Sequence, residues 1–183
     1  MYYEIEIAGL KRQLPLCRVT DDLYIGAFIM FGDTEITTTA AKELLEKAPD
    51  FDVIITAESK GIPLAYEMAR QAGNADYVVA RKEPKLYMTD VISTAVDSIT
   101  TDHTQTLCLG KTEVDLMKGK RVLIVDDVIS TGGSLASLEK LVSLVGGNIV
   151  GRMTVLAEGA AVMRDDIIFL QVLPVFNPDG SIK

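Results

Sequence analysis

Runs of apolar residues alternate with segments of helical periodicity along most of the chain, a pattern typical of an α/β fold with a mostly parallel sheet. Short, mainly apolar runs occur at residues 52–57, 77–80 and 121–125, and the last of them shows no alternation. Such runs predict strands that are covered on both faces of a sheet. Residues 150–156 and 167–173 predict two further strands near the end of the chain.

Helical spacing predicts three helices, over residues 34–47, 62–72 and 133–145. Asp33 or Thr34 is expected to cap the first helix, because short polar side chains accept hydrogen bonds from its free N–H groups. Pro63 lies in the first turn of the second helix, and Gly73 can adopt the left-handed conformation that ends it. Helices between parallel strands are what the crossover connections of such a sheet require.

Two regions depart from this α/β alternation. Residues 3–7 alternate polar and apolar side chains, and residues 14–19 are expected to pair with them. We therefore expect residues 1–33 to form an N-terminal edge segment. Residues 82–104 are rich in Thr, Ser and Asp, with weak strand signals over 91–96. A loop of this length within a compact domain is usually functional.

The length of 183 residues fits one domain, spanning residues 1–183. The chain carries 26 acidic and 18 basic residues, which gives a net charge of −8. This balance opposes binding to nucleic acid or to an anionic membrane surface, because both require a cationic face. No uninterrupted apolar run approaches the roughly 18 residues that a membrane-spanning helix needs. We expect neither nucleic acid nor membrane as a partner.

The cysteine content and the first residues indicate a cytoplasmic protein. Cys17 and Cys108 are the only cysteines, too few for a disulfide framework or a metal site. The first ten residues lack a basic segment followed by an apolar one, so we expect no secretory signal.

The stretch 122–134 (VLIVDDVISTGGS) carries the most informative chemistry. A buried strand delivers Asp126 and Asp127 to its carboxyl end, where open α/β sheets bind ligands. A loop of hydroxyls and glycines then opens a helix. Gly132 and Gly133 allow positive φ and close approach of a ligand, and the N–H groups of the helix N-terminus favour an anion. This arrangement predicts a site for a phosphate group.

Two carboxylates beside a phosphate are tolerable when they accept hydrogen bonds from ribose hydroxyls or approach a divalent cation. The motif therefore predicts a phosphorylated ribose, accompanied by Mg²⁺. It lacks the Lys of a nucleotide P-loop, which makes that class a poor match. A phosphoacceptor receiver domain would begin with a similar strand, but too few residues follow Asp126 to complete that fold. A solvated acidic turn without a ligand is the remaining alternative.

The stretch 122–134 resembles the phosphoribosyl pyrophosphate (PRPP) binding motif of type I phosphoribosyltransferases, and the chain from about Asp22 onward is most similar to adenine and related purine members. The resemblance implies a central, mostly parallel sheet flanked by helices, with a small N-terminal hood (1–33). Asp126 and Asp127 would act in catalysis and hold the ribose hydroxyls. The 5′-phosphate would be held by Ser130, Thr131, Gly132, Gly133 and Ser134.

Two further segments fall where the family has functional loops. Residues 57–61 (AESKG) resemble its pyrophosphate loop, where a peptide that is often cis turns amides toward pyrophosphate. In this sequence that peptide would join Glu58 to Ser59. Residues 82–104 resemble the family's mobile flap. The resemblance assigns pyrophosphate binding to Glu58, Ser59, Lys60, Gly61, Arg81, Lys82 and Lys85, and Lys85 would also act in catalysis.

Two positions depart from the family pattern. His103, with Asp102 beside it, stands near the position of a flap Glu that assists the base, and a histidine there can exchange a proton near neutral pH. Phe31 and Gly32 correspond to the segment that contacts the base, and Gly32 replaces an expected Arg. This departure at Gly32 leaves the identity of the base open.

The resemblance implies a pentosyltransferase of purine salvage. The enzyme would transfer the phosphoribosyl group of PRPP to a purine-type base, release pyrophosphate, use Mg²⁺ and form a homodimer. The alternative is a regulator or binding module that senses PRPP without turning it over.

Overall fold

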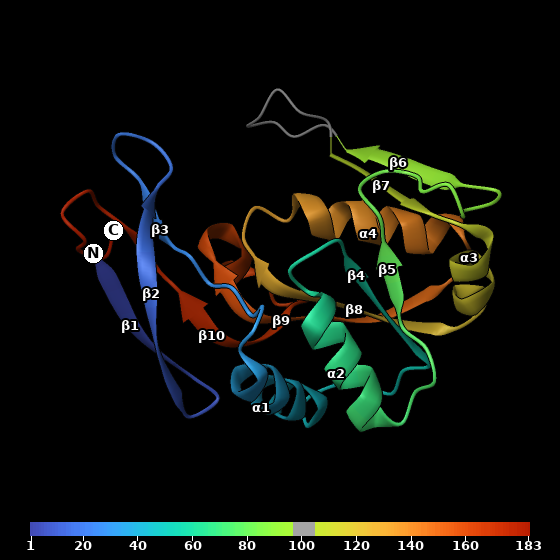
Figure 1. Cartoon of the computed structure of the whole chain (residues 1–183), viewed down its shortest axis with the longest axis horizontal. Helices are drawn as coiled ribbons and strands as arrows, with labels where there is room; N and C mark the ends of the chain where they lie inside the picture. Colours follow the sequence, from blue (N-terminus) through green and yellow to red (C-terminus); the bar gives the residue numbers. More distant parts are fainter. Residues whose placement is uncertain (97–104) are drawn as a thin grey trace.

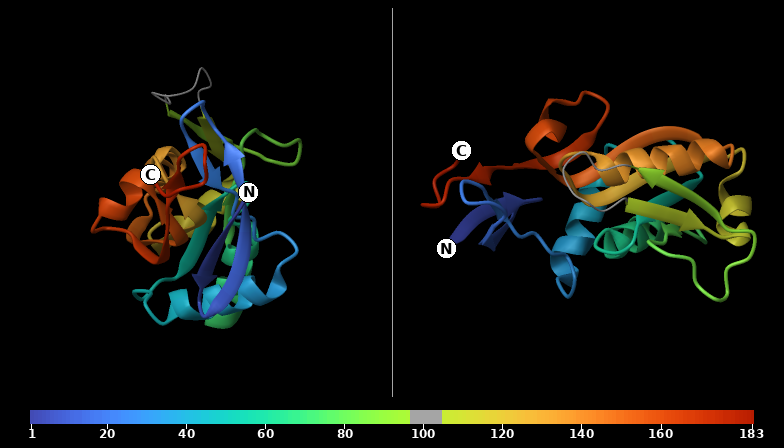
Figure 2. Two further views of the ribbon diagram at one scale, coloured as in Figure 1. Left: turned by 90° about the vertical axis from the view of Figure 1, so that its left-hand side faces the viewer. Right: turned by 90° about the horizontal axis from the view of Figure 1, so that it is seen from above.

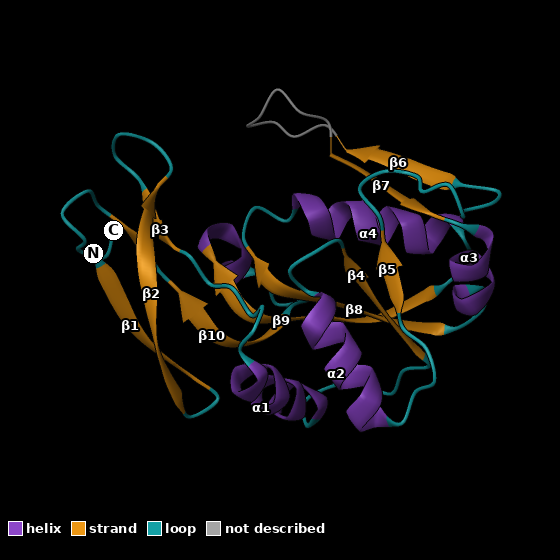
Figure 3. Ribbon diagram, in the orientation of Figure 1, coloured by secondary structure: helices purple, strands orange, loops and turns teal. Residues whose placement is uncertain are grey.

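The structure is a computed structural model that describes residues 1–96 and 105–183. At its centre lies a sheet of five parallel strands (Figures 1 and 3). Its strand order is β10–β9–β8–β4–β5, and every neighbouring pair is parallel. The strands are β4 (Val53–Ala57), β5 (Val78–Ala80), β8 (Arg121–Ile129), β9 (Asn148–Glu158) and β10 (Ile168–Leu173). The predicted α/β class with a mostly parallel sheet is confirmed.

Helices cover both faces of this sheet. They are α1 (Thr34–Leu45), α2 (Ile62–Ala72), α3 (Lys111–Met117) and α4 (Gly133–Leu144), and a short 3₁₀ helix η1 spans Gly159–Met163. Leu123 and Val125 pack with α1 and α2 in one apolar cluster. Val122 and Ile124 pack with α4 in another. Because successive side chains of a strand point to opposite faces, β8 is apolar throughout this stretch.

The helix termini form as their sequences predict. The Asp33 side chain caps α1 by accepting a hydrogen bond from the Ile36 N–H at 3.0 Å. Pro63 lies in the first turn of α2, and Gly73 ends that helix with a left-handed φ of 77°. Helix α1 ends at Leu45, two residues before the predicted end.

A second, antiparallel sheet forms the hood beside the edge strand β10 (Figure 2). It consists of β1 (Tyr2–Ile7), β2 (Leu10–Arg18), β3 (Tyr24–Gly26) and β11 (Val175–Phe176), in that order. The expected hairpin of β1 with β2 is present, but its register differs from the prediction: residues 10–15 pair with β1, with Ile5 opposite Arg12, whereas residues 16–18 pair with β3. Strands β3 and β11 were not predicted, because three- and two-residue strands carry almost no periodic signal. Both ends of the chain therefore belong to the hood.

The region after β5 contains regular structure that the sequence indicated only in part. Strand β6 (Ile92–Val96) matches the weak strand signals, and it pairs with an unpredicted strand β7 (Gln105–Leu109). Helix α3 was also missed, although Glu113 forms a capping-box contact with the Gly110 N–H at 3.0 Å. No helix in the described ranges is both long and apolar enough to span a membrane.

Candidate active site

A pocket of about 380 Å³ opens at the carboxyl ends of β4 and β8. Parallel strands bring their carboxyl ends to one edge of a sheet, so the loops that follow β4 and β8 meet there. Among the predicted site residues, those that line it are Glu58, Ser59, Lys60, Lys82, Asp126, Asp127 and Ser134. Strand β8 runs four residues further than predicted, so both aspartates lie within the strand rather than after it.

The loop after β4 has a backbone form that matches the resemblance. The peptide bond between Glu58 and Ser59 is cis, as predicted. Gly61 packs so closely that a Cβ there would lie 2.3 Å from Thr56 Oγ1 and 2.9 Å from Asp126 Oδ1. Since such distances are far below van der Waals contact, only glycine brings this loop against β8 without displacing its neighbours.

Lys60 and Asp127 join the two loops of the pocket. The Lys60 ammonium donates a hydrogen bond to Asp127 Oδ2 at 2.9 Å. The Lys60 side chain is half exposed, whereas only 3% of the Asp127 side chain is exposed. A carboxylate buried this deeply requires a charged partner. Lys60 therefore supplies the charge compensation for Asp127.

Asp126 has a different electrostatic environment. Burial raises the pKa of the Asp126 carboxyl well above its usual range, and the neighbouring charge of Asp127 raises it further. Asp126 Oδ1 also accepts a hydrogen bond from the Asp127 N–H at 2.9 Å. Two adjacent carboxyls with one nearby ammonium are expected to share less than two full negative charges.

Two polar residues near this edge were not predicted. Glu158 ends β9, beside β8, and its Oε1 is buried without a hydrogen-bond partner among the described residues. Desolvation raises the pKa of Glu158, and the charge of Lys60 opposes that rise. Thr56 Oγ1 is likewise buried without a partner in the described ranges. A polar residue at the end of a predicted strand was the available signal for Glu158.

The cations predicted to bind pyrophosphate are partly engaged by neighbouring acids. Glu58 accepts a hydrogen bond from the Lys82 N–H at 3.0 Å, and its other oxygen lies 3.4 Å from the Arg81 guanidinium. Lys85 does not line the pocket, and its ammonium lies 2.6 Å from Glu83. The Glu58 side chain therefore holds Arg81 and Lys82 beside the loop.

The predicted phosphate loop leads directly into α4. Gly132 precedes the helix with a left-handed φ of 84°, whereas Gly133 is the first helical residue. Both glycines allow positive φ, and only Gly132 adopts it, because α4 begins at Gly133. The N–H groups of the first helical turn lack intrahelical acceptors, and Ser134 in this turn lines the pocket.

The residues predicted to act on the base lie apart from this pocket. Phe31 is 52% exposed, and Gly32 has a φ of 82°. Gly32 lines a separate hollow of about 220 Å³ between the start of α1 and α2. His103 and Asp102 lie outside the described residues. The pocket thus brings Asp126, Asp127 and Ser134 together with residues 58–60 and Lys82. The other residues predicted to hold phosphate and pyrophosphate do not line it, and neither do Phe31 and Gly32.

A parallel sheet with a hood at one edge, a glycine-bearing turn before a helix, and two adjacent acids in the last part of β8 are typical of α/β proteins that bind a ligand at the carboxyl ends of the strands. The sequence matches the family described as "Phosphoribosyl transferase domain" over residues 33–178. The chain belongs to this family.

Curated relatives and solved structures agree with that membership. The adenine phosphoribosyltransferase of Petrotoga mobilis is 39% identical, and the alignment covers 98% of this chain and 94% of the relative. That of Acetivibrio thermocellus is 35% identical over 60% of this chain, and the match spans 61% of the relative, less than two thirds of it. The crystal structure of adenine phosphoribosyltransferase from Thermoanaerobacter pseudethanolicus superimposes with a TM-score of 0.67 at 25% identity, covering 94% of this chain and 95% of the other.

Proposed function

We propose that the protein is a purine phosphoribosyltransferase of the adenine type. It transfers the 5-phosphoribosyl group of PRPP to a base and releases pyrophosphate. The observation that carries the proposal is the pocket in which the 58–61 loop meets Asp126 and Asp127. The relatives named above, which carry the name adenine phosphoribosyltransferase, support the choice of base.

Each part of PRPP has a candidate partner in this arrangement. Asp126 and Asp127 accept hydrogen bonds from the ribose hydroxyls, and the turn from Ser130 to Ser134 receives the 5′-phosphate at the start of α4. The 58–61 loop directs backbone amides toward the pyrophosphate. These roles place C1 of the ribose between the two loops, where the base attacks it.

The reaction separates charge, and the proposed role of the chain is to stabilise that separation. As the C1–O bond breaks, the ribose becomes oxocarbenium-like and the pyrophosphate gains negative charge. Lys60, Arg81, Lys82 and Lys85 stabilise the leaving group by electrostatic attraction, which requires no covalent catalysis. Lys60 is released from Asp127 when the ribose hydroxyls take over that carboxylate. In the same proposal the segment 82–104 acts as a flap that excludes water, and His103 exchanges a proton with the base. Residues 97–104 of that segment, His103 included, lie outside the described residues.

Mg²⁺ fits this site as a companion of PRPP rather than as a resident ion. Mg²⁺ in proteins usually takes one or two carboxylates together with substrate phosphates. Lys60 already occupies one oxygen of Asp127, and the described residues contain no group of three or more metal-binding side chains. Asp126 and Asp127 are therefore the residues that would lie near the ion. When bound, Mg²⁺ supplies positive charge at the pyrophosphate oxygens.

The assembly and location belong to the same proposal. A homodimer of a single domain is expected from the resemblance to the family. Light scattering coupled to gel filtration measures the mass directly.

Cys17 is exposed and Cys108 is buried, and both are free thiols, which supports a reducing cytoplasmic location.

The test is pyrophosphate release from PRPP and Mg²⁺ across a panel of purine and pyrimidine bases. We expect release with adenine, with Asp126→Asn reducing PRPP affinity at least about tenfold because charge-assisted hydrogen bonds are lost. Asp115→Asn, on the exposed surface of α3, is the matched control. Tight PRPP binding without release for any base would assign the chain to the PRPP-sensing regulators instead.

A further inference from the structure

Arg12 occupies an unexpected position in the hood hairpin. Strand β2 alternates, and the register places Arg12 directly opposite the buried Ile5. Directly opposed residues share one face of a sheet, and Leu14 on the same side of β2 is buried. The burial pattern of β2 therefore predicts an apolar residue at position 12, where the sequence has Arg12. A guanidinium at such a position costs free energy unless it is paired.

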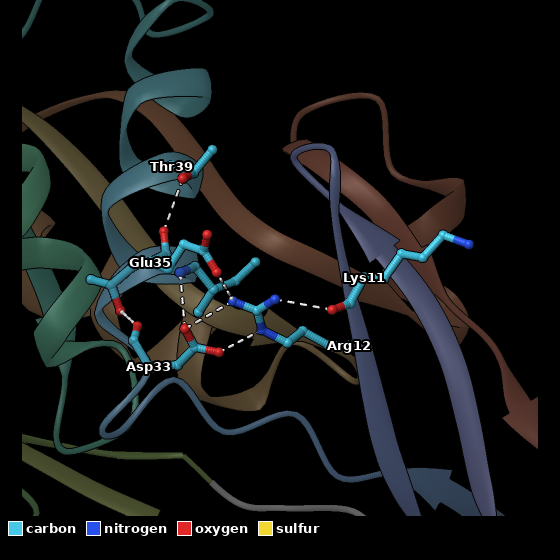
Figure 4. Close-up of polar contacts among 7 residues, drawn as sticks. Lys11, Arg12, Asp33, Glu35 and Thr39 are labelled. Carbon is cyan, nitrogen blue, oxygen red and sulfur yellow. Dashed lines mark hydrogen bonds and ion pairs between the residues drawn. The ribbon is translucent and has the colours of Figure 1, made fainter.

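The partners of Arg12 lie in a different part of the fold (Figure 4). Its Nε donates to Asp33 Oδ2 at 2.6 Å, and its Nη2 donates to Asp33 Oδ1 at 3.1 Å. Nη2 also donates to Glu35 Oε2 at 2.8 Å, and Nη1 donates to the Lys11 carbonyl at 3.0 Å. This is a two-pronged Arg–carboxylate contact, the geometry that fixes orientation as well as distance.

Asp33 transmits this contact to the segment before α1. Besides capping the helix, its backbone N–H donates to the Met30 carbonyl at 3.1 Å and closes a turn. Within that turn Gly32 has a left-handed φ of 82°, and the Met30 side chain is buried. Arg12, in a hood strand, thus holds one end of a turn whose other end is anchored in the core.

The turn borders a hollow whose other wall is α2, the helix that follows the pyrophosphate loop. Met30, Gly32 and Asp33 line about 220 Å³ together with Pro63 and Tyr66 of α2. Helix α2 begins at Ile62, immediately after the loop that ends at Gly61. A base attached to C1 of PRPP has to lie near the 58–61 loop, and this hollow, on the helix that follows the loop, offers an apolar wall and an aromatic ring.

We infer that Arg12 is a positioning residue for the base. It does not contact the base itself but acts through Asp33, by fixing the turn of residues 30–33. The inference rests on the proposed function, and it makes the hood hairpin part of base recognition. The PRPP pocket is built from the ends of β4 and β8, which Arg12 does not touch. Loss of Arg12 therefore weakens base binding and leaves PRPP binding intact.

The test is steady-state kinetics of Arg12→Gln with each substrate varied in turn. We expect KM for the base to rise about five- to twentyfold, as for loss of a charged hydrogen-bond network at partial exposure, with KM for PRPP changed less than about twofold. Arg12→Lys should restore only part of the effect, because an ammonium cannot make the two-pronged contact. Lys11→Gln is the matched control, since Lys11 pairs with Glu4 inside the hairpin.

Asp33→Asn keeps the test valid if Arg12→Gln is too unstable to assay. Asparagine caps helices as well as aspartate does, so this variant removes the charge of the pair and retains the cap. It should raise KM for the base as Arg12→Gln does, and the two changes together should be less than additive. An unchanged KM for the base, or an equal rise for both substrates, overturns the inference. Wild-type protein that turns over no base would instead contradict the proposed function, and with it this inference.

Discussion

Lys60 and Asp127 are 67 residues apart in the sequence, yet the Lys60 ammonium lies 2.9 Å from Asp127 Oδ2. The contact joins the loop after β4 to the end of β8. One partner is half exposed and the other is buried, so the Lys60 ammonium can leave toward a ligand while Asp127 stays in place. A ligand that binds the Lys60 ammonium therefore competes with an ion pair that stabilises the folded protein.

Lys60→Gln should reduce both stability and PRPP affinity. The change leaves the Asp127 carboxylate buried without its cation, which should lower the free energy of unfolding by about 1–3 kcal/mol, below the cost for a fully buried pair because Lys60 is half exposed. PRPP affinity should fall about tenfold or more. Thermal melts and calorimetric titration measure the two effects.

The control for this prediction is Lys111→Gln. Lys111 is about as exposed as Lys60, but its partner Asp115 is also exposed, so Lys111→Gln should leave the melting temperature nearly unchanged. Equal melting temperatures for Lys60→Gln and the wild-type protein would show that Asp127 does not depend on Lys60.

Gly61→Ala should fail for a steric reason. The added Cβ would lie 2.3 Å from Thr56 Oγ1 and 3.3 Å from the Asp126 Cα, so the 58–61 loop must move away from β8. Overpacking of this kind costs about 1–3 kcal/mol, and PRPP affinity should fall with it. Removing the obstructing hydroxyl in Thr56→Ala/Gly61→Ala should recover part of both losses. Full PRPP affinity in Gly61→Ala alone would mean that the loop position is not critical.

The parts of the fold and site that the sequence predicts are those coded by neighbouring residues. Pro63 and Gly73 delimit α2 locally, and Asp33 caps α1 through the N–H of Ile36, three residues away. The pocket was predictable because two local motifs each follow an apolar strand, and parallel strands end at the same edge. That the two loops meet in space follows from the geometry common to all parallel sheets, although the loops are far apart in the sequence.

The parts that could not be predicted depend on partners far apart in the sequence. Strand β11 pairs with β3 although about 150 residues separate them, and neither strand is long enough to show periodicity. Arg12 pairs with Asp33 through tertiary packing of the hood. Glu158 joins the site only because β9 lies beside β8. None of these contacts has a local signature.

Asp126→Asn should lower PRPP affinity and raise the melting temperature at alkaline pH. The native pKa of Asp126 is raised, mainly by burial, so its contribution to stability is full below the unfolded pKa of about 3.9 and is lost as pH rises through the native value. Asparagine keeps the Oδ1 acceptor and does not ionise. The variant should therefore melt above the wild-type protein near pH 8, and the gain should disappear toward pH 4. A gain that is independent of pH would contradict the raised pKa.

Asp52→Asn provides a control of opposite sign at the other edge of the sheet. Hydrogen bonds from Arg121 lower the pKa of Asp52 to about 2. Its contribution to stability is present above about pH 3.9 and is lost as pH falls through about 2. Asp52→Asn should therefore lower the melting temperature at neutral pH and converge with the wild-type protein below pH 2. PRPP affinity should not change, because Asp52 precedes β4 at its amino end.

Removal of Mg²⁺ should affect the protein only when PRPP is present. Asp127 is engaged by Lys60, and the described residues contain no group of three or more metal-binding side chains, so we expect the ion to be held mainly through the phosphates of PRPP. EDTA should leave the melting temperature of the substrate-free protein unchanged. With PRPP present, the same treatment should abolish most of the ligand-induced rise in melting temperature, because a ligand stabilises by its occupancy of the native state. Differential scanning fluorimetry with and without PRPP measures both effects. A rise in melting temperature from Mg²⁺ alone, at millimolar concentration and without PRPP, would point instead to a metal site built by the protein itself.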